Sequence, residues 1–173
     1  MKKLKNKAVF LDRDGVINID TGYIHKIKDF SFQEGIFTLL KKLQNLGYLL
    51  IVVTNQSGIG RKYYKESDFQ KLTNWMIEKF KEKDIKIKKV FYCPHTPEDK
   101  CECRKPNNAM IENAVKEFSV DPVNSWMIGD KDSDIQAALK SSIKNTILLT
   151  SEKKSIAKYS ANSLYDIINI IKD

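Results

Sequence analysis

Asp12 and Asp14, two aspartates one residue apart, are the side chains of this 173-residue sequence that point most directly to chemistry. They follow the apolar run Ala8–Leu11 and precede Gly15. An apolar run of this kind predicts a buried strand, and open α/β sheets place their ligands just beyond the carboxyl ends of such strands. Two carboxylates held close together repel each other unless a cation lies between them, which indicates a Mg²⁺ site with oxygen ligands. Taken alone, the same residues also fit an ordinary Asx-type turn.

Further polar residues follow the other predicted strands. Thr54 offers a hydroxyl group, and the turn 55–58 offers backbone N–H groups, which together suit phosphate oxygens. Lys105 offers a positive charge, while Asp130 and Asp134 either complete a Mg²⁺ site or cap a helix. Each of these residues alone has an ordinary explanation in a turn or on a solvated surface. Because the carboxyl ends of parallel strands lie along one edge of a sheet, we expect all of them to meet there.

Apolar periodicity predicts the elements that position these residues. An irregular segment over 18–32 is expected to form a flap over the site. The alternation of strands and helices predicts an α/β fold of one domain, residues 1–173: a Rossmann-like three-layer α/β/α sandwich around a mostly parallel sheet. The expected strands are 8–11, 48–53, 90–92, 126–128 and 146–149; the expected helices are 35–46, Ser67 or Asp68 to Phe80, 108–118, one beginning near Ser133 or Asp134, and 164–171.

A cluster of metal-binding residue types lies between the third predicted strand and Lys105. It consists of Cys93, His95, Cys101 and Cys103. Four such ligands in one loop predict a closed, structural, tetrahedral Zn²⁺ site, which would set where Arg104 and Lys105 point. A disulfide is the alternative, but it would leave one cysteine unpaired.

Composition argues against two classes of partner. The net charge of +8 comes mostly from lysines interleaved with acidic residues, which favours a solvated surface over a nucleic-acid-binding face. No apolar run has the length of a membrane span, and no signal peptide is apparent, so we expect a cytoplasmic protein without a membrane partner. His25, in the expected flap, fits an exposed loop residue better than a ligand.

The motifs resemble, in order, the four motifs of the haloacid dehalogenase (HAD) superfamily of phosphotransferases, here without a large cap domain. Longer strings resemble the D,D-heptose 1,7-bisphosphate phosphatases and the related histidinol-phosphate phosphatases, over about residues 8–150. These strings are Asp12-Arg13-Asp14-Gly15-Val16-Ile17-Asn18, Gly22-Tyr23, Thr54-Asn55-Gln56-Ser57-Gly58-Ile59, Cys93-Pro94-His95 and Cys103-Arg104-Lys105-Pro106.

The resemblance implies a Mg²⁺-dependent phosphomonoesterase that acts through an aspartyl-phosphate. Asp12 would be the nucleophile and Asp14 the general acid and base, with Thr54 and Lys105 completing the catalytic set. Mg²⁺ would be held by Asp12, Asp14 (through its backbone carbonyl) and Asp130, with Asp134 as a further candidate. The same four cysteine and histidine residues would bind Zn²⁺. The implied substrate-binding residues are Asn55, Gln56, Ser57, Arg61 and Arg104.

The implied substrate is the sugar phosphate D-glycero-D-manno-heptose 1,7-bisphosphate, losing its C7 phosphate in the biosynthesis of nucleotide-activated heptose, with the enzyme expected to be a monomer. Histidinol phosphate is the alternative, because five residues separate His95 from Cys101 and Gly60-Arg61-Lys62 departs from the heptose pattern. A nucleic-acid 3′-end phosphatase and a non-catalytic zinc-stabilised binding module are less favoured.

Overall fold

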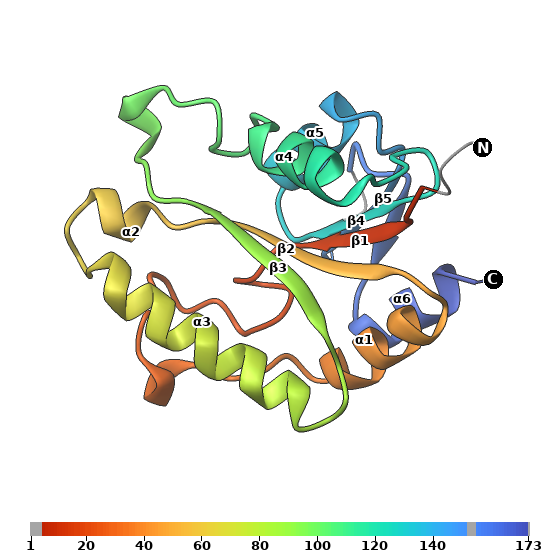
Figure 1. The fold of residues 1–173 in the computed structure, drawn as a ribbon, viewed down its shortest axis with the longest axis horizontal. Helices are drawn as coiled ribbons and strands as arrows, with labels where there is room; N and C mark the ends of the chain where they lie inside the picture. Colours follow the sequence, from red (N-terminus) through yellow and green to blue (C-terminus); the bar gives the residue numbers. More distant parts are fainter. Residues whose placement is uncertain (1–4, 152–154, 173) are drawn as a thin grey trace.

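The computed structural model describes residues 5–151 and 155–172 and arranges them as a parallel sheet between two layers of helices (Figure 1). The strands are β1 (Ala8–Leu11), β2 (Leu49–Asn55), β3 (Ile87–Cys93), β4 (Trp126–Gly129), β5 (Asn145–Leu149) and β6 (Tyr159–Ala161). Their order across the sheet is β3-β2-β1-β4-β5-β6, and every neighbouring pair is parallel. The predicted α/β sandwich is therefore confirmed.

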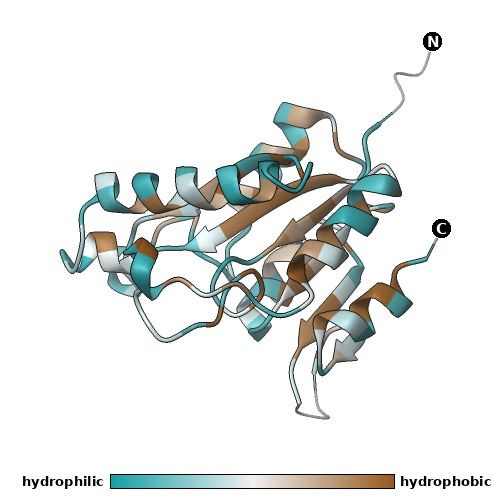
Figure 2. Cartoon of the chain, turned by 90° about the horizontal axis from the view of Figure 1, so that it is seen from below, coloured by the Kyte–Doolittle hydropathy of each residue, from teal (hydrophilic) through white to brown (hydrophobic). Residues whose placement is uncertain are grey.

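Helices cover both faces of the sheet (Figure 1). They are α1 (Ile36–Asn45), α2 (Ser57–Gly60), α3 (Glu66–Lys81), α4 (Ala109–Phe118), α5 (Asp132–Lys140) and α6 (Leu164–Ile170), with short 3-10 turns at Ile27–Asp29 and Pro97–Asp99. Buried side chains of α1, α3 and α6 form one core with the sheet, and those of α4 and α5 form a second core on the opposite face. Figure 2 shows the hydrophobic strands between helices whose outer surfaces are hydrophilic.

The central strand β1 explains why the first carboxylates lie at the middle of the sheet edge. All four of its residues are buried, as expected for a strand covered on both faces. Phe10 lies in register with Ile51 on one side and with Met127 on the other. The chain therefore leaves the sheet at Asp12 between the ends of β2 and β4.

The start of α3 differs from the prediction that Ser67 or Asp68 caps it. The helix begins at Glu66, and Lys65 is the N-cap. Asp68 instead accepts a hydrogen bond from the backbone N–H of Lys65 at 2.9 Å. A carboxylate at the third helical position can reach back to a free N–H of the first turn, so this acid stabilises the helix start from inside the helix.

The start of α5 follows the same rule. The helix begins at Asp132, near Ser133 as predicted, with Lys131 as the N-cap. Asp134 accepts the backbone N–H of Lys131 at 3.1 Å. Asp134, which the sequence offered as a Mg²⁺ ligand or a helix cap, is thus the third residue of the helix.

Two elements lie outside the predicted pattern. Strand β6 is three residues long and mostly exposed, so it lacks the apolar run of a buried strand. Strand β3 begins at Ile87 rather than at residue 90, because the exposed residues Lys88 and Lys89 hide its start in the sequence. Among the described helices, none combines the length and the apolar composition needed to cross a membrane.

Segment 18–32 is irregular, as predicted, and returns to the sheet edge. Asn18 forms isolated bridges with Asp14 and Phe32, and the side chains of Ile24 and Phe30 are buried. These contacts fix both the start and the middle of this segment, which we call the flap, next to the carboxyl end of β1.

Candidate active site

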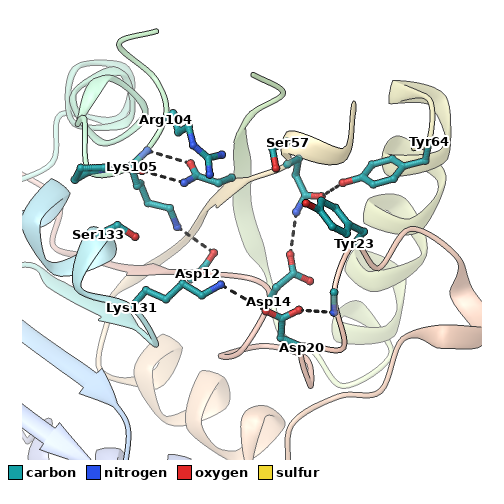
Figure 3. Close-up of a pocket in the computed structure, with 14 residues that line it drawn as sticks. Asp12, Asp14, Asp20, Tyr23, Ser57, Tyr64, Arg104, Lys105, Lys131 and Ser133 are labelled. Carbon is teal, nitrogen blue, oxygen red and sulfur yellow. Dashed lines mark hydrogen bonds and ion pairs between the residues drawn. The ribbon is translucent and has the colours of Figure 1, made fainter. Parts of the chain in front are cut away.

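A cavity of about 490 Å³ opens at the carboxyl ends of β1 and β2 (Figure 3). The loop after β1 contributes Asp12 and Asp14, and the flap contributes Asp20, Gly22 and Tyr23. The other described lining residues are Asn55, Gln56, Ser57, Tyr64, Arg104, Lys105, Pro106, Lys131 and Ser133. Segments far apart in the sequence therefore converge at one edge of the sheet, as predicted from the strand pattern.

Lys105 is buried beside Asp12 and holds it by an ion pair. Its Nζ atom lies 3.0 Å from Asp12 Oδ1 and 2.6 Å from Asp134 Oδ1, and it donates to the Val53 carbonyl at 2.7 Å. The backbone N–H of Arg13 also donates to Asp12 Oδ1, at 2.8 Å. Asp12 Oδ1 is thus fixed by two donors, which sets the direction of the carboxylate.

Burial and close contact shift the pKa values of Lys105 and Asp12. Burial would lower the pKa of Lys105, but the carboxylates of Asp12 and Asp134 outweigh it and raise that pKa, so the ammonium stays charged. Burial raises the pKa of Asp12 well above its usual range, and Lys105 opposes the effect while Asp134 and Asp130 add to it. An additional cation at this position would favour the ionised form of Asp12.

Asp14 is held by donors on both of its oxygens. Oδ1 accepts from Arg13 Nε at 3.2 Å, from Arg13 Nη2 at 2.9 Å and from Asn18 Nδ2 at 3.1 Å. Oδ2 accepts from Gln56 Nε2 at 3.0 Å. The side chain is directed into the cavity beside Asp12 (Figure 3), where it could exchange a proton with a bound substrate.

Gln56 links Asp14 to two other side chains. Its Nε2 atom also donates to Thr54 Oγ1 at 2.9 Å, and its Oε1 atom accepts from the Tyr64 hydroxyl at 2.6 Å. Burial raises the pKa of Tyr64 to about 12, so this hydroxyl remains a donor at neutral pH. The structure therefore fixes which end of the Gln56 amide faces Asp14.

The five predicted substrate-binding residues occupy different environments. Asn55, Gln56, Ser57 and Arg104 line the cavity. The Asn55 side chain also exchanges two hydrogen bonds with the Lys105 backbone, at 3.0 and 3.1 Å, so it braces the loop that carries the lysine. Arg61 is not among the described lining residues, and its Nη2 atom lies 4.0 Å from Glu98 Oε2. Its role in substrate binding stays a prediction.

Asp12, Asp130 and Asp134 form a group whose carboxylate oxygens lie within 4.8 Å of one another. Asp130 Oδ1 is buried and has no hydrogen-bond partner among the described residues, which suits a cation ligand. Asp134 is different, since Oδ1 faces Lys105 and Oδ2 accepts the backbone N–H groups of residues 130 and 131. We therefore assign Asp134 to holding the lysine and the helix start, with Asp12 and Asp130 as the carboxylates that fit Mg²⁺.

The loop after β3 brings its four predicted zinc ligands together. The Cys93 Sγ atom lies 3.4 Å from Cys101 Sγ and 3.6 Å from His95 Nδ1, and the latter lies 3.3 Å from Cys103 Sγ. All three cysteines are free thiols at separations well beyond a disulfide bond of roughly 2 Å. The cluster can hold a metal ion and suits a tetrahedral zinc site, in place of the alternative disulfide.

Three cavity residues were missed in the sequence. Lys131 and Ser133 line the cavity and lie between Asp130 and Asp134, the two residues of this segment that the sequence indicated. The Lys131 Nζ atom lies 3.5 Å from Asp20 Oδ2, which connects α5 to the flap (Figure 3). The available signal was a lysine two residues after the end of β4. No signal in the sequence marked Tyr64, because it reaches the site from the loop after α2.

Comparisons with known proteins agree with this geometry. A family model described as HAD-hydrolase-like matches residues 102–168. D-glycero-beta-D-manno-heptose-1,7-bisphosphate 7-phosphatase of Haemophilus influenzae is 42% identical, covering 96% of this chain and 97% of its own. The D-glycero-alpha-D-manno-heptose-1,7-bisphosphate 7-phosphatase of Campylobacter jejuni is 49% identical, covering 98% of both chains.

A solved structure shares the fold. D,D-heptose 1,7-bisphosphate phosphatase from B. bronchiseptica, complexed with magnesium and phosphate, superposes with a TM-score of 0.83 at 23% identity. The match covers 95% of this chain and 99% of that one. The relatives named here act on heptose bisphosphates, so they give no support to the histidinol-phosphate alternative.

Proposed function

Because this chain belongs to the HAD-like family of heptose-1,7-bisphosphate 7-phosphatases, we propose that it removes the C7 phosphate of D-glycero-D-manno-heptose 1,7-bisphosphate. The observation that carries the proposal is the pair Asp12 and Asp14 at the floor of the cavity, in a chain that matches such enzymes over nearly its whole length. As predicted from the sequence, this step would serve the biosynthesis of nucleotide-activated heptose.

Asp12 is the nucleophile of the proposed reaction. Its carboxylate attacks the C7 phosphorus in line, and the bond between phosphorus and the sugar oxygen breaks. Lys105 holds Asp12 Oδ1 at 3.0 Å and supplies positive charge beside the phosphate. The product of this step is the dephosphorylated C7 hydroxyl and an aspartyl-phosphate on Asp12.

Asp14 moves the protons. It donates one to the leaving sugar oxygen, then takes one from the water that attacks the aspartyl-phosphate and restores Asp12. Its place beside Asp12 in the cavity supports this role (Figure 3). The amide of Gln56, fixed by Tyr64, keeps the carboxylate facing the cavity.

Two metal ions are part of the proposal. Asp12, Asp130 and the backbone carbonyl of Asp14 would hold Mg²⁺, which when bound neutralises the repulsion between the nucleophile and the phosphate. Zn²⁺ would bind Cys93, His95, Cys101 and Cys103 in a purely structural site. In that position it would fix the loop that carries Arg104 and Lys105, both of which line the cavity.

Arg104 and Ser57 are the proposed contacts for the rest of the substrate. Both line the cavity across from Asp14, and a guanidinium group can bind a second phosphate or a sugar hydroxyl with two parallel hydrogen bonds. A cytoplasmic, monomeric enzyme is the accompanying prediction.

A substrate panel tests the proposal. Phosphate release is measured with both anomers of heptose 1,7-bisphosphate, with histidinol phosphate and with a 3′-phosphorylated oligonucleotide. The named relatives include enzymes for each anomer, so both are assayed. We expect kcat/KM to be highest for one of the heptose anomers, and Asp12→Asn to abolish release from every substrate. Preferred turnover of histidinol phosphate or of the oligonucleotide would contradict the assignment.

A further inference from the structure

Arg13 lies directly beneath the active site with a buried guanidinium group. Its neighbours Asp12 and Asp14 face the cavity, while Arg13 turns inward and is 1% exposed. The guanidinium carbon lies 5.7 Å from the centre of the Phe69 ring. Its Nη1 atom is buried without a hydrogen-bond partner among the described residues.

Packing does not explain an arginine at this position. Taking a guanidinium group out of water is costly, and leaving one of its nitrogens without a partner adds to that cost. An apolar side chain of similar length would fill the same space without either penalty. The role of Arg13 therefore lies in the contacts that its other two nitrogens make.

Those contacts converge on a single oxygen of Asp14. Oδ1 accepts from both Nε and Nη2 of Arg13, and Asn18 Nδ2 is a third donor to it. A carboxylate oxygen offers about two lone-pair sites, so three donors leave no room for a proton on Oδ1. Among the described residues, Oδ2 accepts a hydrogen bond only from Gln56, and it therefore keeps a site for a proton.

We propose that Arg13 is a positioning residue: by holding Oδ1 of Asp14, it makes Oδ2 the oxygen that carries the proton during catalysis. The inference rests on the acid–base role of Asp14 in the proposed function. In the first step the O–H bond at Oδ2 breaks, and its proton goes to the sugar oxygen as the bond from that oxygen to phosphorus breaks and phosphorus bonds to the Asp12 carboxylate. In the second step a proton of the attacking water goes to Oδ2 as the water oxygen bonds to phosphorus and the bond between phosphorus and the Asp12 carboxylate breaks, which releases inorganic phosphate.

The same guanidinium group also holds the flap. Its Nη2 atom donates to the Ile24 carbonyl at 2.8 Å, and the neighbouring flap residues Gly22 and Tyr23 line the cavity. One side chain thus holds both the carboxylate of Asp14 and a segment that lines the cavity. A lysine could not reproduce this arrangement, because it presents a single charged nitrogen in place of a planar fork of donors.

The test compares substrates whose leaving groups differ in their need for a proton. A sugar alkoxide needs an acid to leave, whereas p-nitrophenolate leaves readily without one. General acid catalysis contributes about 10²- to 10⁴-fold to the rate. Loss of a correctly directed acid should therefore lower kcat/KM mainly for the sugar phosphate. We measure kcat/KM for heptose 1,7-bisphosphate and for p-nitrophenyl phosphate on the same preparation of each variant, so any unfolded fraction cancels in the ratio.

We expect Arg13→Lys and Arg13→Met to lower kcat/KM at least about tenfold more on the sugar phosphate than on the aryl phosphate. Asp14→Asn should show the same dependence on the leaving group. Phe80→Leu is the packing control: it removes buried volume in the core of α3, away from Asp14, and should lower the melting temperature while leaving the ratio unchanged.

The outcomes distinguish a failure of the inference about Arg13 from a failure of the proposed acid role of Asp14. Equal losses on both substrates in the Arg13 variants, with a clear leaving-group dependence in Asp14→Asn, would show that Arg13 is only structural and overturn the inference. Equal losses in Asp14→Asn itself would remove the acid role from the proposed function, and the inference would fall with it. A ratio changed in Phe80→Leu as much as in Arg13→Lys would also overturn it.

Discussion

Gly15→Ala is expected to disturb the proposed metal site while leaving the fold intact. Gly15 has a φ of +94°, and a Cβ atom built on it would lie 2.2 Å from Asp130 Oδ2 and 2.5 Å from Asp130 Cγ. The carboxylate would have to move by roughly 1 Å or more to reach an ordinary van der Waals contact. Because it is the end of a short side chain, it can rotate away while the backbone keeps its course.

The expected loss is therefore one of activity more than of stability. A left-handed alanine costs about 1–2 kcal/mol of stability. A displacement of about 1 Å in a group that positions the reaction can cost about 100-fold in rate, and Asp130 is one of the proposed Mg²⁺ ligands. We expect kcat/KM to fall about 100-fold, and the Mg²⁺ concentration for half-maximal activity to rise.

Gly47→Ala is the matched control. Gly47 has a similar φ of +83°, but its Cβ atom would meet only Lys7 Cε, at 3.8 Å, beyond the end of α1 and away from the cavity. Both variants carry the same backbone strain, so the difference between them measures the clash with Asp130. Phosphate release is assayed against Mg²⁺ concentration, with the melting temperatures measured in parallel. Activity of Gly15→Ala within threefold of Gly47→Ala would refute the reasoning.

Three further predictions use other parts of the site. Asp12→Asn is expected to remove measurable turnover and leave the circular-dichroism spectrum unchanged; activity within tenfold of wild type would exclude Asp12 as the nucleophile. Cys101→Ser should lower zinc content and activity, measured by metal analysis and phosphate release, whereas Glu102→Ser should change neither; full zinc occupancy in Cys101→Ser would argue against the site. Tyr64→Phe should lower kcat several-fold, because the Gln56 amide loses the donor that orients it. Since burial raises the folded-state pKa of Tyr64 to about 12, the folded protein binds more protons than the unfolded chain between about pH 10 and 12. Wild type should therefore lose its stability advantage over Tyr64→Phe across that range in urea unfolding, and a constant difference would count against a buried, hydrogen-bonded hydroxyl.

The sequence was sufficient to predict which strand ends meet, because that follows from a parallel sheet alone. Apolar runs before Asp12, Thr54 and Asp130 predicted three buried strands, and their carboxyl ends lie on one edge. The cysteine spacing predicted a metal-binding cluster for a different reason: four soft or borderline ligands in one short loop can reach a common ion when the loop turns back on itself.

The contacts that orient these residues could not be predicted from patterns. Tyr64 reaches Gln56 only because Gly58 has no side chain: a Cβ atom there would lie 2.1 Å from the Tyr64 ring. Asn55 is predicted to bind the substrate, yet its amide also braces the Lys105 backbone from 50 residues away in the sequence. Such contacts depend on loop paths in three dimensions and leave no periodic signal.

The regiochemistry of phosphate release is the most direct test of the central claim, that this chain is a 7-phosphatase of heptose 1,7-bisphosphate. The reaction is followed by ³¹P NMR, in which the anomeric phosphate and the C7 phosphate give separate signals. We predict that the C7 signal is replaced by that of inorganic phosphate in equal amount, while the C1 signal persists in the product. Loss of the C1 signal, or no change in either, would contradict the account.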